Sequence, residues 1–145
     1  MDDLELLTAT GADIAIAQLY AALCLRAAVF VVEQDCVYLD PDGRDLEPTT
    51  VHIWASAPNG AAASYVRVLA EPGGGHRIGR VVTDPSFRGH HLAARLLDEA
   101  LAHCQRPVVL HAQSHLVHVY GRHGFVPDGP AFLDDGIPHT PMRLA

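Results

Sequence analysis

The segment TDPSFRGHHLAARLL (83–97) carries the residues best suited to chemistry, since a basic turn leads directly into the apolar repeat of a helix. A helix start leaves backbone N–H groups without internal partners, and the helix dipole adds partial positive charge there. Arg88 adds a permanent charge to this start, and Gly89 lets a ligand approach the backbone closely. The segment therefore predicts a phosphate or other anion site, with a plain strand-to-helix connection and a solvated arginine as the alternative.

Two further groups of side chains could bind ions. His111, His115 and His118 have a spacing that could gather a metal, but no carboxylate or cysteine close by completes a ligand set. Solvated or core histidines are therefore the favoured interpretation. The acidic segment DPDGRD (40–45) resembles part of a calcium loop and lacks the downstream glutamate. Asx turns explain this segment, or its carboxylates attract a cationic amine. We expect no metal.

Composition and charge limit the classes of partner. The chain has 145 residues, enough for one hydrophobic core, so we expect a single domain over 1–145. A formal net charge of −7 argues against nonspecific binding to nucleic acid or to an anionic membrane. The start lacks a signal-peptide pattern, and we expect no apolar run long enough to cross a bilayer. Cys24, Cys36 and Cys104 form no close pair, as is typical of reduced thiols, so we expect a cytoplasmic protein.

Periodicity and turn signals predict the elements that position the anion turn. Helices are predicted over 13–29, 89–103 and 114–123, and strands over 4–9, 51–57, 62–70, 77–83, 107–112 and 124–127, with 139–145 as a last edge strand. FVVEQ (30–34) follows the first helix and precedes a polar loop over 35–50. The buried face predicted for helix 89–103 consists of Leu92, Leu96, Leu97, Ala100 and Leu101. Strands that first pair as neighbours and later alternate with helices predict one mixed α/β sheet.

Two motifs together resemble a known family. R-G-x-x-L-A at 88–93, followed by Y-x-x-x-G-F at 120–125, is similar to the GNAT superfamily of acyl-CoA-dependent N-acyltransferases, although His91 stands where that family has a glycine. The resemblance to its ElaA-like branch covers most of residues 18–143. It rests on the segments 25–47, VHIWA, IGRVV, HAQSHLVHVYGRHGFVP and DDGIPHTPM.

The resemblance implies a GNAT-type α/β fold, with a mixed, mostly antiparallel central sheet flanked by helices. It also implies that backbone amides in the first turn after the central strand hold the coenzyme A pyrophosphate. The residues concerned are Arg88, Gly89, His90, His91, Leu92 and Ala93. Main-chain groups of Val81, Val82 and Thr83 are implied to pair with the pantetheine arm like an added strand.

Acyl transfer from a thioester to an amine needs a deprotonated amine, a stabilised oxyanion and a departing thiolate. By resemblance, Tyr120 donates a proton or hydrogen bond to the sulfur, since a phenol stays protonated at neutral pH; a packed core tyrosine is the alternative. Glu33 ends an apolar run, where partial burial would raise the pKa of its carboxyl toward that of a general base. A solvated glutamate at an element end is the alternative, and Arg26 could pair with Glu33 or face water.

The function implied is an N-acetyltransferase that moves acetyl from acetyl-CoA to a small-molecule or peptide amine in a ternary complex, as a monomer or homodimer. His115 and Asp135, in family-like segments, are implied to line the acceptor pocket. Neither Cys36 nor Cys104 lies near the motifs, which argues against a covalent intermediate. The alternative is a non-catalytic acyl-CoA-binding sensor or scaffold. A homoserine-lactone-type synthase ranks last, because only its R-x-x-V-F segment is visible.

Overall fold

A sheet of eight strands organises the chain in a computed structural model that describes residues 4–145. The strand order is β1-β2-β3-β4-β5-β8-β6, with β7 paired to β8 outside this path. Among the strands of residues 4–145, only the β4–β5 pair is parallel. The strands are β1 (Leu6–Thr10), β2 (Val51–Ser56), β3 (Ala62–Ala70), β4 (His76–Thr83), β5 (Val108–Gln113), β6 (Val126–Pro127), β7 (Phe132–Asp134) and β8 (Ile137–Leu144). The fold class expected from the sequence is confirmed.

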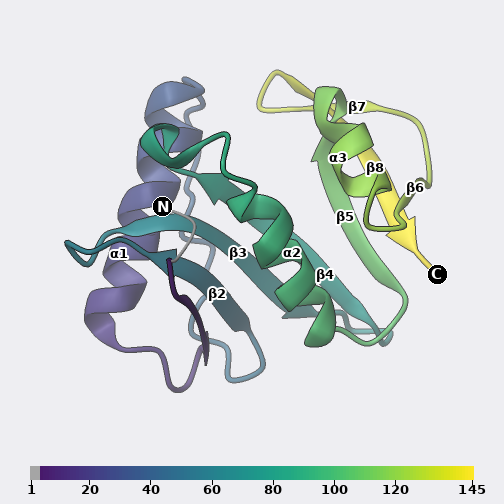
Figure 1. Cartoon of the computed structure of the whole chain (residues 1–145). Coiled ribbons are helices and arrows are strands. Elements are labelled where there is room, and N and C mark those ends of the chain that lie inside the picture. The colour runs from purple at the N-terminus through teal and green to yellow at the C-terminus, as the bar shows by residue number, and fades with distance from the viewer. Residues whose placement is uncertain (1–3) are drawn as a thin grey trace.

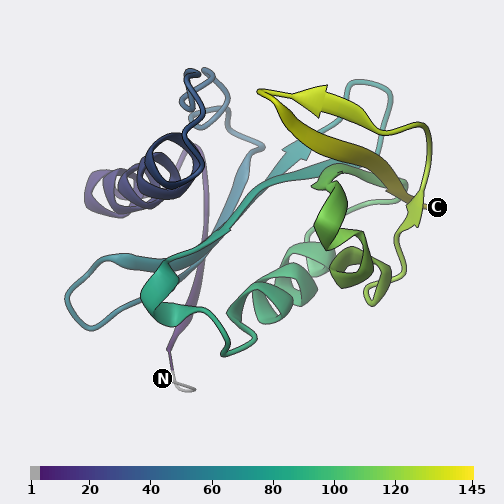
Figure 2. The same ribbon diagram turned by 90° about the horizontal axis from the view of Figure 1, so that it is seen from above.

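Helices cover both faces of this sheet (Figure 1). Figure 2 shows α1 on one side of the strands and α2 with α3 on the other. The helical elements are α1 (Ile16–Arg26), the π-helical η1 (Ala27–Glu33) that continues it, the short 3-10 turns η2 (Pro85–Phe87) and η3 (Ser114–Leu116), α2 (Leu92–Ala102) and α3 (Val117–Gly121). Because both layers cover β3, that strand is buried along almost its whole length.

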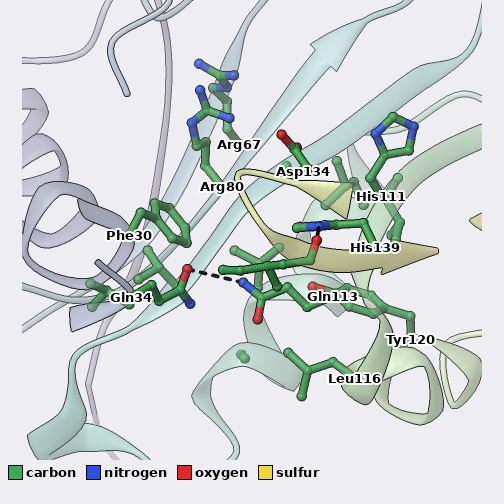
Figure 3. A pocket seen from close by; sticks show the side chains of 18 of the residues that line it. Phe30, Gln34, Arg67, Arg80, His111, Gln113, Leu116, Tyr120, Asp134 and His139 are labelled. Atoms are coloured by element: carbon green, nitrogen blue, oxygen red, sulfur yellow. Dashed lines mark hydrogen bonds between the residues drawn. The ribbon is translucent and has the colours of Figure 1, made fainter. Parts of the chain in front are cut away.

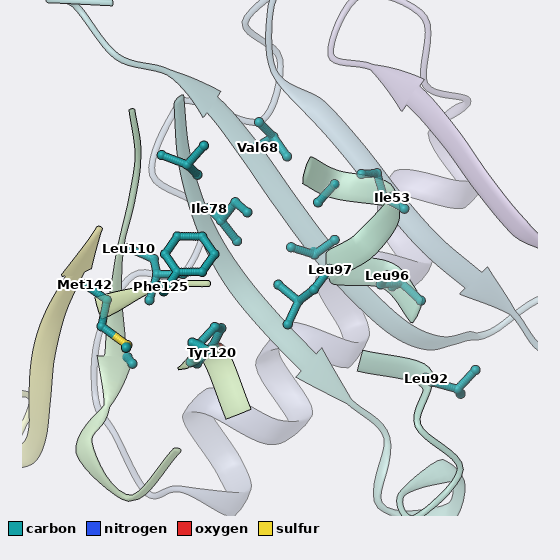
Figure 4. Close-up of a cluster of buried hydrophobic side chains, with 14 of the residues drawn as sticks. Ile53, Val68, Ile78, Leu92, Leu96, Leu97, Leu110, Tyr120, Phe125 and Met142 are labelled. Carbon is teal, nitrogen blue, oxygen red and sulfur yellow. The ribbon is translucent and has the colours of Figure 1, made fainter. Parts of the chain in front are cut away.

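Each helical layer has its own hydrophobic core. The α2 layer buries Leu92, Leu96, Leu97 and Ala100 against the sheet, as its helical spacing predicts, and Leu101 is only partly buried (Figure 4). On the opposite face, the helix α1–η1 packs its inner side against β2, β3 and β4. That second cluster contains Ala22, Leu25, Val29, Trp54, Ala62, Tyr65 and Val82. Strand β4 contributes Ile78 to the first cluster and Val82 to the second, so it is packed from both sides.

Strands β4 and β5 pair over only two residues and then separate. The parallel ladder joins His76 to Val108 and Arg77 to Val109 and extends no further. A β-bulge lies beyond this point: Tyr65 pairs with Val82 and Arg67 with Gly79, and Arg80 has a positive φ of 55°. A bulge bends its strand and leaves a residue outside the ladder. The bend therefore opens a gap in the middle of the sheet, visible in Figure 1 between β4 and β5.

Two sequence-based expectations about the elements need correction. The first helix does not stop at 29, because FVVEQ continues it in π-helical form to Glu33. The tail 139–145 is not an edge strand: it belongs to β8, which lies between β5 and β6. Strands β7 and β8, which the sequence did not predict as a pair, form a hairpin whose turn has positive φ at Asp135 (51°) and Gly136 (78°).

The helix Ile16–Glu33 also overturns the expectation that no apolar run is long enough for a bilayer. It has 18 residues with a mean hydropathy of 1.7, so it meets that requirement by length and composition alone. Its inner face nevertheless packs on the sheet through Ala22, Leu25 and Val29. Arg26, in its middle, is fully buried and ion-paired within the protein. Sheet packing thus accounts for the apolar character of this inner face.

A buried network of arginines and aspartates fastens the loop 35–50 to the core. Arg26 bonds Asp40 and Asp45, each at 2.7 Å, and therefore neither pairs with Glu33 nor faces water. Arg67 bonds Asp42 at 2.7 Å and Asp45 at 3.1 Å. Although burial acts against it, the arginine hydrogen bonds hold the pKa of the Asp42 and Asp45 carboxyls below their usual range. These carboxylates are committed to internal arginines, so the suggestion that they attract a cationic amine is wrong.

Candidate active site

A cavity of about 680 Å³ occupies the gap between β4 and β5 (Figure 3). Residues from both helical layers line it, so it runs through the sheet rather than along one face. Its walls come from η1 (Val29, Phe30, Glu33), β4 (Ile78, Gly79, Arg80, Val81, Val82, Thr83), α2 (Ala93, Leu97), β5 (Leu110, His111, Gln113), η3 and α3 (His115, Leu116, Val119, Tyr120) and the β7–β8 hairpin (Asp134, Asp135, Ile137, His139). Most sequence-predicted site residues therefore meet around one space.

The anion turn between η2 and α2 has the backbone that a phosphate cradle needs. Gly89 has φ 85° and His91, which immediately precedes α2, has φ 60°. The amide of Arg95 is the first to bond back into the helix, to the carbonyl of His91 at 3.1 Å. The amides of Gly89 through Ala94 have no hydrogen-bond partner within residues 4–145. Because these donors stand at the positive end of α2, they are suited to an anion.

His91 shows why a glycine is expected at its position. A left-handed φ suits glycine and strains an L residue, because its Cβ approaches the backbone. The backbone at His91 adopts that conformation nonetheless, and the side chain is exposed. The substitution therefore preserves the turn geometry at the expense of some strain. It adds no side-chain cap to the helix.

The outer part of β4 offers an unpaired edge to the cavity. Pairing with β5 ends at Arg77, and Val81, Val82 and Thr83 all line the cavity beyond it. On its other edge the same stretch is held by β3, and the Ser64 hydroxyl donates to the carbonyl of Val82 at 3.0 Å. A strand with one fixed edge and one free edge can accept an extended ligand by β-augmentation.

Tyr120 reaches the cavity from α3. Its side chain is 8% exposed and packs edge-on to Phe125, with 6.4 Å between the ring centroids. Figure 3 shows its hydroxyl pointing inward, toward Gln113. Burial raises the pKa of Tyr120 to about 12, so the phenol is protonated throughout the neutral range. The geometry suits a proton donor.

Glu33 does not have the environment expected for a base. Its carboxylate receives two hydrogen bonds from Arg88, both 2.9 Å long, and 43% of its side chain is exposed. The bonded Arg88 guanidinium lowers the pKa of the carboxyl. The expected burial and raised pKa are therefore wrong. Arg88 in turn donates from Nε to the carbonyl of Thr83 at 3.1 Å, so its side chain braces the anion turn from outside.

Another group of side chains, which we did not predict from the sequence, lines the wall of the cavity formed by β5 and β8. Strand register places Gln113 of β5 beside His139 of β8, and His139 beside Phe132 of β7. Gln113 then donates from Nε2 to Oε1 of Gln34 at 3.3 Å, which joins β5 to the end of η1 across the cavity (Figure 3). The Asp135-Gly136 turn signal could have indicated the hairpin, and with it the pairing of His139.

His115 and Asp135, expected at the acceptor pocket, are both exposed and both line the cavity. Asp135 lies in the hairpin turn, and its carbonyl accepts a weak bond from the Cys36 thiol at 3.7 Å. His111 lies on the same wall, where burial and then the charge of Arg77 lower the pKa of its imidazole. Within residues 4–145, no group of three or more His, Cys, Asp or Glu side chains is arranged to hold a metal ion.

Comparison with known proteins gives consistent relatives. A family model described as an acetyltransferase (GNAT) domain matches residues 40–145. A UPF0039 protein of Mycobacterium tuberculosis is 48% identical over 128 residues, which span 86% of this chain and 82% of that protein. Protein ElaA of Escherichia coli is 39% identical over 142 residues, which span 90% and 89% of the two chains.

Two crystal structures extend the likeness to three dimensions. That of an acyl-CoA N-acyltransferase from Pseudomonas aeruginosa matches with a TM-score of 0.91 and 40% identity, over 99% of this chain and 100% of that one. The crystal structure of Escherichia coli ElaA matches with a TM-score of 0.89 and 36% identity, over 97% and 98% of the chains. The similarity therefore extends over almost the whole chain.

Proposed function

This chain belongs to the GNAT acetyltransferase family, in its ElaA-like branch, and we propose that it transfers an acetyl group from acetyl-CoA to a primary amine by direct attack in a ternary complex. The family and the acyl-CoA N-acyltransferase fold support acyltransferase activity in general. The observation that carries the finer proposal is the continuous path from the unpaired amides of the anion turn, along β4, to the hydroxyl of Tyr120.

The proposed binding mode of acetyl-CoA follows from the positions of the unpaired backbone amides. Backbone amides from Gly89 to Ala93 would hold the pyrophosphate, and the exposed side chain of His90 stands beside them. The pantetheine arm would lie along the free edge of Val81, Val82 and Thr83 as an added strand. This arrangement directs the thioester into the gap between β4 and β5, where Tyr120 lies.

In the chemical step, the neutral amine attacks the thioester carbonyl carbon, a C–N bond forms and the carbonyl oxygen becomes an oxyanion. A backbone amide of β4 beside the bulge at Arg80 would stabilise that oxyanion. As the C–S bond breaks, Tyr120 gives its hydroxyl proton to the coenzyme A sulfur. The reference pKa of a thiol is near 8.5, so a thiolate leaves more readily than most groups, and proton donation helps it further.

The alternative of the same fold is a sensor or scaffold that binds acyl-CoA without turnover. The inward hydroxyl of Tyr120 favours the enzyme, because it faces the cavity and no residue in 4–145 hydrogen-bonds it, whereas a purely structural tyrosine usually has such a partner. A buried phenol directed at an opening is suited to a reacting partner.

The test is release of free thiol from acetyl-CoA with spermidine, tyramine and a lysine-containing peptide as acceptors. We expect release that depends on at least one amine, and acetylated product of matching amount by mass spectrometry. Binding of coenzyme A by calorimetry, with no amine-dependent release from acetyl-, propionyl- or succinyl-CoA, would instead identify the sensor. Comparing these three acyl-CoAs also tests the preference for acetyl.

A further inference from the structure

His139 lines the candidate active-site cavity from the side of the β7–β8 hairpin. It lies on β8, half-buried, and lines the cavity together with its cross-strand neighbour Gln113. Gln113 is the last residue of β5, directly before the η3–α3 segment that carries Tyr120. Figure 3 draws the Gln113 side chain next to the Tyr120 hydroxyl, with the His139 ring above both. His139 is therefore near the point where an amine would meet the thioester.

The hydrogen bonding of His139 selects one form of its neutral ring. Nδ1 lies 2.8 Å from the main-chain carbonyl of Ile137, and a carbonyl can only accept a hydrogen bond. Nδ1 must therefore carry the proton, which leaves the lone pair of the neutral ring on Nε2. Within residues 4–145, Nε2 has no hydrogen-bond partner. A base oriented by a fixed acceptor on its other nitrogen is the arrangement that general-base catalysis uses.

Ring contacts fix the plane of this imidazole. Phe132, the β7 residue paired with His139, stacks on it with 5.9 Å between centroids and an interplanar angle of 26°. His111 meets the Phe132 ring edge-on at 5.0 Å. Three aromatic rings from three strands thus pack in one group, and His139 is the member with a backbone bond that settles its tautomer.

The other candidate bases are less suited to the task. Glu33 is held by two hydrogen bonds from Arg88, which occupy its carboxylate. Asp135 lies in an exposed turn, where its carboxylate has no orienting bond to a residue in 4–145. His115 is exposed on η3, and no bond to another residue of the described part of the chain fixes its ring.

We propose that His139 is the group that accepts the proton of the acceptor amine, through Nε2. This role rests on the proposed transferase function. As the amine nitrogen bonds to the thioester carbon, its proton passes to Nε2 and the C–S bond breaks. Tyr120 protonates the departing sulfur, and the imidazolium and phenolate are reset by proton exchange through solvent. The products are an amide and coenzyme A thiol, so atoms and charges balance.

The surroundings of His139 define what a pH profile should report. The charged or titratable side chains near it include His111 on β5, Asp134 on β7, Asp135 in the β7–β8 turn and, one strand further away, Arg77 on β4, which is ion-paired to Glu71. The amine substrate also titrates, and its contribution cancels when the rate of a variant is divided by that of the wild type at each pH. The ratio therefore reports a change in the enzyme and not in the substrate.

The key variant is His139→Asn. An asparagine amide nitrogen can reproduce the Nδ1 hydrogen bond to Ile137, but the amide cannot take up a proton. We expect kcat to fall about 10²- to 10⁴-fold, with unchanged acetyl-CoA affinity by calorimetry. The wild-type advantage should shrink in acid, because a protonated imidazole cannot accept the amine proton. Added imidazole should restore part of the activity of His139→Ala.

The matched control is His118→Asn, an exposed histidine on α3 that does not line the cavity, and its rate ratio should be near one at every pH. If His139→Asn does not fold, His139→Gln provides the same readout. A variant rate within threefold of the wild type, with a pH-independent ratio, would overturn the role of His139 while leaving the transferase intact. Wild-type protein that binds acetyl-CoA and acetylates no amine would instead overturn the transferase, and the role of His139 with it.

Discussion

The carboxylate of Glu33 and the guanidinium of Arg88 form a two-pronged ion pair, with both nitrogen–oxygen distances at 2.9 Å. Glu33 is the last residue of η1 and Arg88 directly follows η2, so the pair joins the first helix to the anion turn. A bidentate arginine–carboxylate pair restricts orientation as well as distance. Glu33 therefore positions the turn, rather than providing the raised pKa of a general base.

Replacing Glu33 by Gln should loosen the turn without removing the chemistry. Exposed ion pairs contribute little free energy. We therefore expect the KM for acetyl-CoA to rise only about two- to fivefold. The value of kcat should stay within about twofold, and the same KM change should appear in Arg88→Gln and not add in the double variant. Loss of a general base lowers kcat roughly a hundredfold or more. A loss of that size at constant KM would show that Glu33 is the general base.

Tyr120→Phe removes only the hydroxyl and keeps the ring packed on Phe125. We expect kcat to drop about 10²-fold or more, with the dissociation constant of coenzyme A unchanged by calorimetry. Because burial raises the pKa of Tyr120 to about 12, the wild-type rate should show no loss from phenol ionisation between pH 7 and 10. Equal rates for both proteins would assign Tyr120 to the hydrophobic core alone.

Substitutions at Gly89 and His91 should change the backbone strain of the anion turn in opposite directions. A Cβ at Gly89 would meet no atom within 4 Å, so Gly89→Ala tests backbone strain alone at φ 85°. We expect it to cost about 1 kcal/mol of stability and to weaken coenzyme A binding. His91→Gly relieves the same kind of strain and should bind at least as tightly as the wild type. Thermal unfolding and calorimetry of both variants check this, and weaker binding by His91→Gly would show that the imidazole itself contacts the ligand.

The buried arginine–aspartate network predicts the response to acid. The pKa values of Asp42 and Asp45 are lower in the folded than in the unfolded chain, where a carboxyl titrates near 3.9. The folded state therefore keeps this stability above about pH 4 and loses it as the pH falls through the lower folded values. Asp45→Asn leaves Arg26 and Arg67 short of a charge partner and should cost about 3–5 kcal/mol.

Urea unfolding between pH 2 and 7 measures both effects. Asp13→Asn is the matched control, since this exposed carboxylate accepts only a local bond from Thr10. Its unfolding free energy should change by less than about 0.5 kcal/mol, as is usual for surface substitutions. An Asp45→Asn variant as stable as the wild type at pH 7 would show that the loop 35–50 does not depend on these ion pairs.

The sequence by itself determined the fold class, the strand–turn–helix at 77–103 and the motifs that identify the family. Each of these depends on local patterns: the apolar spacing of α2, the glycine at a positive φ, and the order of strands and helices. Such signals act over a few residues, so they can be recognised without knowing how the chain packs. The positions of side chains that depend on tertiary packing could not be recognised in this way.

Only the tertiary structure decided which side chains meet in the gap between β4 and β5. Glu33 and Arg88 lie 55 positions apart in the sequence. Their ion pair lowers the pKa of the Glu33 carboxyl, whereas the apolar run VFVV had predicted a raised pKa. The place of β8 inside the sheet, which brings His139 beside Gln113, depends on long-range strand register. Contacts of this kind are selected by the packing of the whole core, because burial and charge at one side chain depend on residues that are distant in sequence.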